Sequence, residues 1–335
     1  MMNYFRMTGA PDRAIALAQR TLTLVAPLED VGIQARVYQQ LGQVYHTIGD
    51  YRRGMEVLSR SIAILQGALL YEDFGGANPA SVGSLHWLNR CRAEVGAFTE
   101  GLAEADAALR VAEVAHRPSA LAEACQGVGI LHLYKGDVHR AIPGLERALD
   151  LCRTWDMPLY FPTTASTLGY AYTLCGRLAE GMPLLEQAVE QTVAEGRKVN
   201  EALWVTRLGE AALLAGRLEA AHTHAVQALA LARERQERGH QAHALRLLGD
   251  IAARREPPDV KPAEDYHRQA LALADELGMR PLQAHCHLGL GMLYLKTKRS
   301  EQARLELSTA IALYRAMDMT FWLPQAEAAL ADSSR

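Results

Sequence analysis

Residues 41–61 decide the fold of this chain, and they read LGQVYHTIGDYRRGMEVLSRS. Gly42 lies among larger side chains, Gly49 begins a turn, and Gly54 and Ser61 follow at intervals of five and then seven residues. Two antiparallel helices can approach closely where one carries a small side chain and larger residues fill the space beside it. The stretch therefore predicts a helical hairpin with its turn at Gly49.

The same pattern occurs seven times at a nearly constant spacing. The position of Gly42 holds a small residue in each copy, and successive copies are separated by 47, 40, 40, 40, 40 and 42 residues. The seven anchors are Gly42, Asn89, Gly129, Gly169, Gly209, Gly249 and Gly291. A period of roughly 20–50 residues with two helix-length halves is typical of stacked helical hairpins. The sequence thus predicts an all-α superhelix, a solenoid of about seven helical hairpins with a 40-residue period.

The repeat also predicts how the chain is organised. We expect a single solenoid over residues 1–335, with seven hairpins over 29–317 and a C-terminal capping segment over 318–335. Gly9 stands 40 residues before Gly49 and so occupies the turn of an earlier copy. The first helix of that copy is almost missing, which makes residues 1–28 an incomplete repeat. Because an array normally begins with a polar cap, we expect the chain to be a piece of a longer protein.

The helices are expected in pairs on either side of each turn. The predicted pairs are 32–48 with 51–67, 79–95 with 98–115, 119–135 with 138–154, 160–175 with 178–195, 199–215 with 218–236, 239–255 with 262–277, and 281–296 with 299–317. The longer first interval places seven added residues in a loop over 67–83, which is either a functional insertion or added length that a solenoid tolerates.

Composition excludes several classes of partner. The 35 basic and 38 acidic residues are almost balanced, which argues against a nucleic-acid-binding face. No apolar run is long enough to span a membrane, and charges interrupt the N-terminus where a signal peptide would need an apolar stretch. The five cysteines form no C-x-x-C pair and suit small core positions in a reducing cytoplasm. We therefore expect a cytoplasmic protein.

The hairpin pattern resembles the tetratricopeptide repeat (TPR). The resemblance is carried by Leu41, Gly42 and Tyr45, by the turn at Gly49, and by Gly54 with the small residues that follow it in each copy. The usual TPR is about 34 residues long, so each helix here is expected to be longer by about a turn.

Several stretches also resemble a more particular group, the C-terminal TPR region of bacterial signalling proteins. Residues 275–282, 284–291 and 314–323 carry this resemblance, as do residues 168–172 and 252–258. Those proteins join a class III adenylate or guanylate cyclase domain, a P-loop ATPase domain and such repeats. The resemblance implies a regulatory, protein-binding region whose cyclase and ATPase domains lie upstream.

The sequence lacks the motifs that would indicate an enzyme. It contains no phosphate-binding G-x-x-x-x-G-K-[ST] and no nucleophile motif G-x-S-x-G. Histidines two apart on a helix, such as His285 and His287, point in different directions and cannot share one metal ion. His240 and His243 could share a face but lack further ligands in the sequence nearby. We therefore expect no catalytic residues, no cofactor and no metal.

The TPR resemblance implies that the first helix of each hairpin lines a concave groove. Eleven polar or aromatic residues then become candidates for binding a peptide or ligand: Gln39, Gln43, His46, His86, Arg90, Gln126, Ser166, Tyr170, Glu210, Arg246 and Asp250. A mixed polar groove suits an extended peptide or a small polar ligand. The leading hypothesis is a non-catalytic interaction scaffold, part of a cyclase- or ATPase-linked signalling protein. The alternative is a sensor that binds a small effector in the groove.

Overall fold

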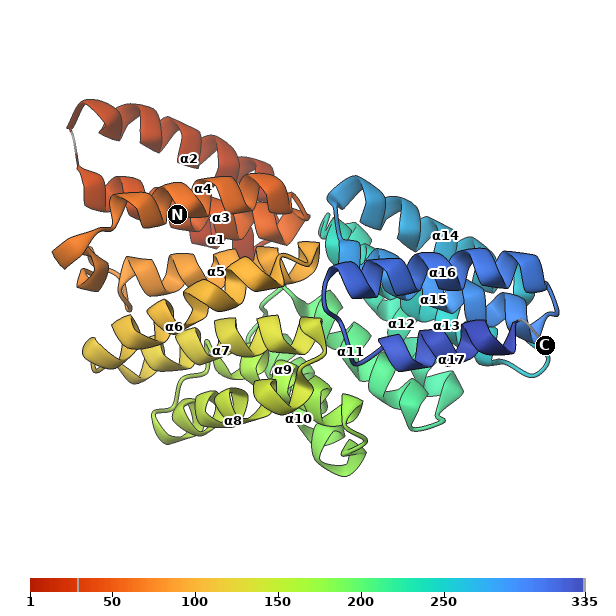
Figure 1. Cartoon of the computed structure of the whole chain (residues 1–335). Coiled ribbons are helices and arrows are strands. Elements are labelled where there is room, and N and C mark those ends of the chain that lie inside the picture. Colours follow the sequence, from red (N-terminus) through yellow and green to blue (C-terminus); the bar gives the residue numbers. More distant parts are fainter. Residues whose placement is uncertain (29, 334–335) are drawn as a thin grey trace.

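The computed structural model describes residues 1–28 and 30–333, and every regular element in that part of the chain is a helix (Figure 1). Seven hairpins follow one another: α3 (Val31–Ile48) with α4 (Tyr51–Ile64), α5 (Ala80–Val95) with α6 (Phe98–Val114), α7 (Pro118–Lys135) with α8 (Val138–Thr154), α9 (Phe161–Leu174) with α10 (Leu178–Ala194), α11 (Glu201–Leu214) with α12 (Leu218–Glu234), α13 (Arg238–Arg254) with α14 (Val260–Leu277), and α15 (Arg280–Lys296) with α16 (Ser300–Ala316). The short α1 (Met2–Met7) and α2 (Pro11–Val25) precede them, and α17 (Leu323–Asp332) follows. The prediction of an all-α superhelix of helical hairpins is confirmed.

The turns inside the hairpins form where the repeat places glycine. Gly49, Gly96 and Gly136 have φ angles of 87°, 77° and 92°, and each directly follows the first helix of its hairpin. Glycine adopts this left-handed conformation without the steric cost that a Cβ atom brings. Asp50 then begins the second helix, since its side chain accepts a hydrogen bond from the backbone N–H of Arg53 at 3.2 Å.

The repeated small residues let the two helices of a hairpin touch. A Cβ atom added at Gly129 would lie 2.6 Å from Leu145 of the second helix, and one at Gly291 would lie 2.6 Å from Leu307. Both leucines are completely buried. Burial of a leucine side chain contributes about 1.5–3 kcal/mol, so each close contact stabilises its hairpin. The repeated glycines thus allow the close helix contact that the sequence pattern predicts.

The added residues between the first two hairpins are packed against the solenoid. They form a 3-10 helix, Gly67–Tyr71, and a turn that lies over the start of α3. Arg36 donates hydrogen bonds to the backbone carbonyls of Asp73 and Asn78, at 2.9 Å for its Nε and 2.6 Å for Nη2. Phe74 packs beside Ala35 and Leu65. These contacts attach the added residues to the first hairpin.

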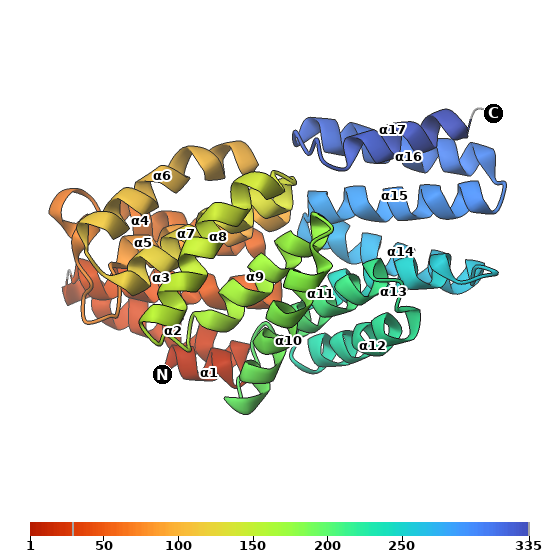
Figure 2. The ribbon, with the colours of Figure 1, turned by 90° about the horizontal axis from the view of Figure 1, so that it is seen from below.

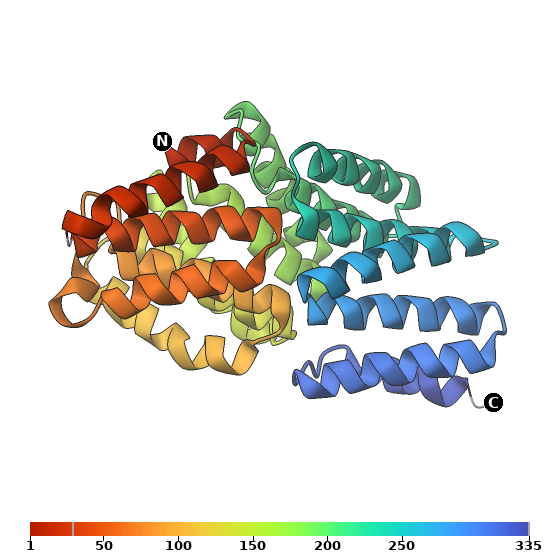
Figure 3. The same ribbon diagram turned by 90° about the horizontal axis from the view of Figure 1, so that it is seen from above.

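The superhelix returns onto itself, which the repeat pattern did not predict. In Figure 1 the helices α1 to α7 lie on the left and α13 to α17 on the right, and the intervening green helices connect them from below. Figures 2 and 3 show the same two groups side by side. Helix α3 contacts α13, and α5 contacts α15. Each of these hairpins therefore touches the hairpin five places further along the chain.

The turn glycines of the early hairpins form part of this contact. Gly96 lies against Met317 and Pro281, and Gly136 lies against Phe321 and Trp322. One hydrophobic cluster combines side chains from α4 and α5 with side chains from α11 to α15. The core is therefore shared between segments that are distant in sequence, and the inner face of the superhelix is enclosed.

Candidate functional site

The eleven predicted groove residues all lie on the first helices of hairpins, from α3 to α13. Enclosure of the inner face buries most of them: Gln39, His46, His86, Arg90, Gln126, Ser166 and Glu210 are buried, and Gln43, Tyr170, Arg246 and Asp250 are half-buried. The structure does not bring them together into one groove. Nine of them line two cavities that have no lining residue in common.

The N-terminal cavity, of about 210 Å³, lies between the first hairpins and α11. Five predicted residues line it, namely Gln39, Gln43, His86, Arg90 and Gln126, and additional lining side chains include Arg6, Trp87, Glu123, Arg197 and Trp204. The C-terminal cavity, of about 510 Å³, lies between α9, α11, α13, α15 and the capping segment. Four predicted residues line it, namely Tyr170, Glu210, Arg246 and Asp250.

The two remaining predicted residues, His46 and Ser166, are buried in the wall of the inner face. His46 lines only a very small space beside Arg90, and its ring lies 5.2 Å from that of Trp87. Burial lowers the pKa of His46 well below its usual value, so the ring is neutral. Ser166 accepts a hydrogen bond of 3.3 Å from Arg207. Neither residue lines one of the two larger cavities.

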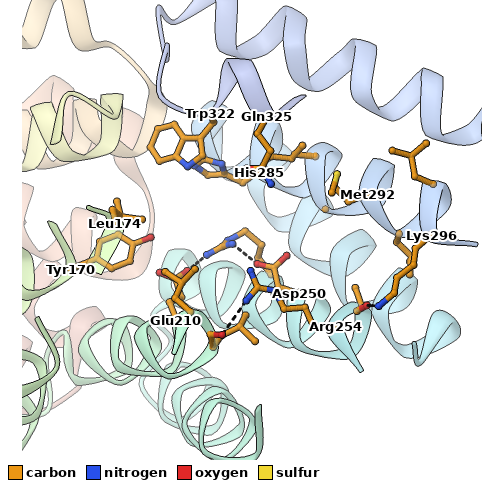
Figure 4. Close-up of a pocket in the computed structure, with 18 residues that line it drawn as sticks. Tyr170, Leu174, Glu210, Asp250, Arg254, His285, Met292, Lys296, Trp322 and Gln325 are labelled. Carbon is orange, nitrogen blue, oxygen red and sulfur yellow. Dashed lines mark hydrogen bonds and ion pairs between the residues drawn. The ribbon is translucent and has the colours of Figure 1, made fainter. Parts of the chain in front are cut away.

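Ion pairs cross the floor of the C-terminal cavity (Figure 4). Arg246 pairs with Asp250, at 2.5 Å between Nη1 and Oδ2, and also with Glu210 from the neighbouring hairpin. Burial disfavours the charged guanidinium and is the largest single effect, but the charge of Asp250 together with smaller contributions from Tyr170 and other neighbours raises the pKa of Arg246. Two carboxylates and one guanidinium therefore hold the floor rigidly across α11 and α13.

Apolar side chains occupy much of the rest of this cavity. Leu214 and Met292 line it and are 45% and 40% exposed, so both present apolar surface inside the cavity. Figure 4 shows Tyr170 and Leu174 on the side opposite Met292, with Trp322 above the floor. The cavity thus offers contacts for an apolar group beside a charged floor.

Two cations lie at the rim of the same cavity. Lys296 donates a hydrogen bond of 3.2 Å to the backbone carbonyl of Ala253, and Arg254 donates one of 3.0 Å to that of Leu213. Both bind carbonyls near the C-terminal ends of helices, where positive charge is favoured. Within the described residues neither has a carboxylate partner. The repeat pattern did not predict these two residues, because they lie at the C-terminal ends of the lining helices and not at the helix positions that were expected to face the groove.

Trp322 has a second role beyond the one predicted for it. The sequence predicts a C-terminal capping segment over residues 318–335, which contains Trp322. In the structure the ring of Trp322 lies 4.6 Å from that of His285 and forms one wall of the C-terminal cavity. It also packs on Gly136, so the capping segment joins the last hairpin to the third.

His240 and His243, which the sequence places on one helix face, are each paired with a carboxylate. His240 lies 2.9 Å from Glu237, and His243 lies 3.1 Å from Glu94 of the second hairpin. Over residues 1–28 and 30–333, no group of three or more His, Cys, Asp or Glu side chains is arranged to hold a metal ion. The helices in those ranges include none that is long and apolar enough to cross a membrane.

Comparison with known proteins supports the tetratricopeptide-like fold. Residues 35–64 match the model of the tetratricopeptide repeat. A Rap protein complexed with competence and sporulation factor superposes with a TM-score of 0.66 at 13% identity, covering 99% of this chain and 95% of that one. The Rap conjugation gene regulator of plasmid pLS20, in complex with the Phr* peptide, superposes with a TM-score of 0.65 at 14% identity, covering 87% and 77%. Among curated proteins, no sequence matches this chain. At these identities the likeness establishes the fold alone.

Proposed function

We propose that this chain is a non-catalytic interaction scaffold that binds an extended peptide segment of a partner protein in the C-terminal cavity. The observation that carries this proposal is the exposure of Leu214 and Met292 inside a cavity of about 510 Å³. Large apolar side chains that remain exposed in a concave site mark a place where a partner is bound.

The polar groups of the cavity suit a peptide backbone and its side chains. Among the described residues, the hydroxyl of Tyr170 and the amide of Gln325 make no hydrogen bond, so both are available to a backbone. Lys296 and Arg254 place positive charge at the rim. The ligand that fits best is an extended peptide with one apolar anchor side chain and an acidic residue near it.

Two further considerations support a peptide ligand. The Rap proteins that share this fold were solved with the Phr* peptide or with competence and sporulation factor. The resemblance to bacterial signalling proteins suggests that the scaffold is a cytoplasmic regulatory region, and that a cyclase domain and an ATPase domain accompany it. Reading the coding region upstream of this segment tests that linkage, and the absence of both domains there would refute it.

The test of the binding site is a peptide-display selection followed by titration of the enriched peptides. Met292→Asp places a charge against the apolar anchor and should weaken binding by about tenfold or more, because an apolar contact is replaced by a buried unpaired charge. Val226→Asp is a matched control, since Val226 is 47% exposed on α12 outside the cavity. Equal affinities of the two variants for the selected peptides would refute the proposed site.

The alternative, a sensor for a small effector, is favoured by a different observation. The polar residues of the N-terminal half of the inner face are enclosed in a cavity of about 210 Å³, which is small for a peptide chain. A ligand that binds only the folded state raises the melting temperature, so a thermal-shift screen of metabolites distinguishes this function from peptide binding.

A further inference from the structure

The N-terminal cavity contains two buried arginines that lack a carboxylate partner. Arg6 of α1 and Arg90 of α5 are 9% and 5% exposed. Within residues 1–28 and 30–333, Arg6 donates hydrogen bonds only to Asn3, at 2.9 Å, and to the sulfur of Met7, at 3.5 Å. Among the described residues Arg90 makes no hydrogen bond and no ion pair. The Nε atoms of both arginines are buried without a partner.

The other arginines of this cavity have partners. Arg36 is held by backbone carbonyls of the loop over 67–83. Arg197 pairs with Glu195 at 2.7 Å and donates to two backbone carbonyls, those of Pro158 and Leu159. The Nε of Arg197 and the Oδ1 of Asn200 are also buried without a hydrogen-bond partner. What distinguishes Arg6 and Arg90 among the described arginines of this cavity is that neither forms an ion pair or donates to a backbone carbonyl.

The nearest carboxylates are already occupied. Glu123, which lines the cavity, accepts a hydrogen bond of 2.7 Å from Asn78. Glu94 is bound by His243 and by the hydroxyl of Tyr134 at 2.9 Å. Glu237, whose charge acts on Arg6, is bound by the backbone N–H of Asn200 and by His240. Each of these three carboxylates is thus engaged by another group, and none of them forms an ion pair with Arg6 or Arg90.

Trp87 compensates the two charges only in part. The guanidinium carbons of Arg90 and Arg6 lie 4.8 Å and 5.5 Å from the centre of its ring, within the range of a cation–π interaction. Burial still lowers the pKa of both arginines, and the neighbouring charge of Arg90 lowers the pKa of Arg6 further, to about 10. Since arginine keeps its charge, two buried cations remain in one cavity, and neither forms an ion pair with a described carboxylate.

We propose that the N-terminal cavity binds a small molecule that carries an oxyanion, a carboxylate or a phosphate, between Arg6 and Arg90. Guanidinium groups bind both kinds of oxyanion through paired N–H donors. Trp87 and Trp204 provide apolar walls for the rest of the molecule, and Asn3 and Asn200 provide amides. The proposal is independent of peptide binding, because the two cavities have no lining residue in common.

Such a ligand would connect parts of the chain that are distant in sequence. Arg6 belongs to α1, Arg90 to α5, and Asn200 and Trp204 lie at the start of α11. An oxyanion in the cavity therefore stabilises the attachment of α1 to the inner wall of the superhelix. Amide hydrogen exchange of α1 is expected to slow when the ligand binds.

The experiment measures melting temperature with inorganic phosphate, malonate or chloride at matched ionic strength. We expect phosphate or malonate, or both, to raise the melting temperature of the wild-type protein above its value in chloride, and the anion that acts identifies the chemistry of the ligand. Calorimetric titration with the same anion should give a saturable signal. If neither anion acts differently from chloride, the proposal is wrong.

Three variants separate specific binding from general salt effects, since phosphate also stabilises proteins by exclusion from their surface. Arg90→Met and Arg6→Met should each lose the anion response and weaken binding by about tenfold or more. Each should also melt higher than the wild type in chloride, because an uncompensated buried charge is removed, and this distinguishes loss of the site from loss of folding. Arg177→Met removes an exposed arginine outside the cavity and should keep the full response. An unchanged response in Arg90→Met would overturn the assignment.

Discussion

Replacement of Gly169 by alanine tests the close approach of the two helices in the fourth hairpin. A Cβ atom at this position would lie 2.8 Å from the backbone carbonyl oxygen of Gly181, 3.0 Å from Leu185 and 3.1 Å from Leu184. The nearest of these atoms belongs to the backbone of α10, so no side-chain rotation can remove the clash. The two helices must therefore move apart.

Two opposing effects decide the size of the change. Alanine is favoured over glycine inside a helix by about 1 kcal/mol. Overpacking of a close contact costs about 1–3 kcal/mol, and here the separation also loosens the buried Leu185. Because the obstacle is backbone, we expect the upper part of that range and a net destabilisation of about 1–2 kcal/mol.

The measurement is urea unfolding of the wild type and two variants, with hydrogen exchange of α9 and α10 to localise the effect. Gly144→Ala is the matched control, because it also lies inside a helix and its added Cβ atom meets only the carbonyl oxygen of Cys125 at 3.9 Å. Gly144→Ala should stabilise the protein by about 0.5–1 kcal/mol. If Gly169→Ala is as stable as Gly144→Ala, the contact between α9 and α10 does not have the geometry described.

Three further predictions concern other parts of the molecule. Ala148→Leu places a large side chain at a completely buried position and should lower the stability in thermal unfolding by about 1–3 kcal/mol. His86 has its pKa lowered to about 3 by burial, so between pH 6.5 and 3 the unfolded chain binds a proton that the folded chain does not. Stability should therefore fall with decreasing pH in that window, and His86→Gln should reduce the slope by at most about 1.4 kcal/mol per pH unit, measured by urea unfolding at several pH values. Glu94→Leu leaves Tyr134 and His243 without their buried acceptor and should cost about 3 kcal/mol, and a double-mutant cycle with His243→Leu should show strong coupling between the two hairpins.

The sequence by itself determined the hairpins and their order. A small residue every 40 positions, a glycine seven residues later and apolar side chains between them are local features, and the physics of helix packing acts on them over one hairpin at a time. This is why the helices lie within three residues of their predicted bounds, as for α4, which ends at Ile64 rather than at residue 67. The same regularity is why the helix positions that were expected to face the groove include Tyr170 and Arg246, which do line the inner face.

Only the tertiary structure decided how the inner face is closed and divided. The small rotation between neighbouring hairpins accumulates along the array, and a slight change in it determines whether distant hairpins meet. That rotation depends on many side-chain contacts between hairpins, and no single residue encodes it. The contacts of Gly96 with Met317 and of Gly136 with Trp322 therefore could not be predicted from the repeat. On this inner face Arg6 of α1 lies beside Arg90 and Trp87, and the face that the sequence presents as one groove holds two cavities with different lining residues.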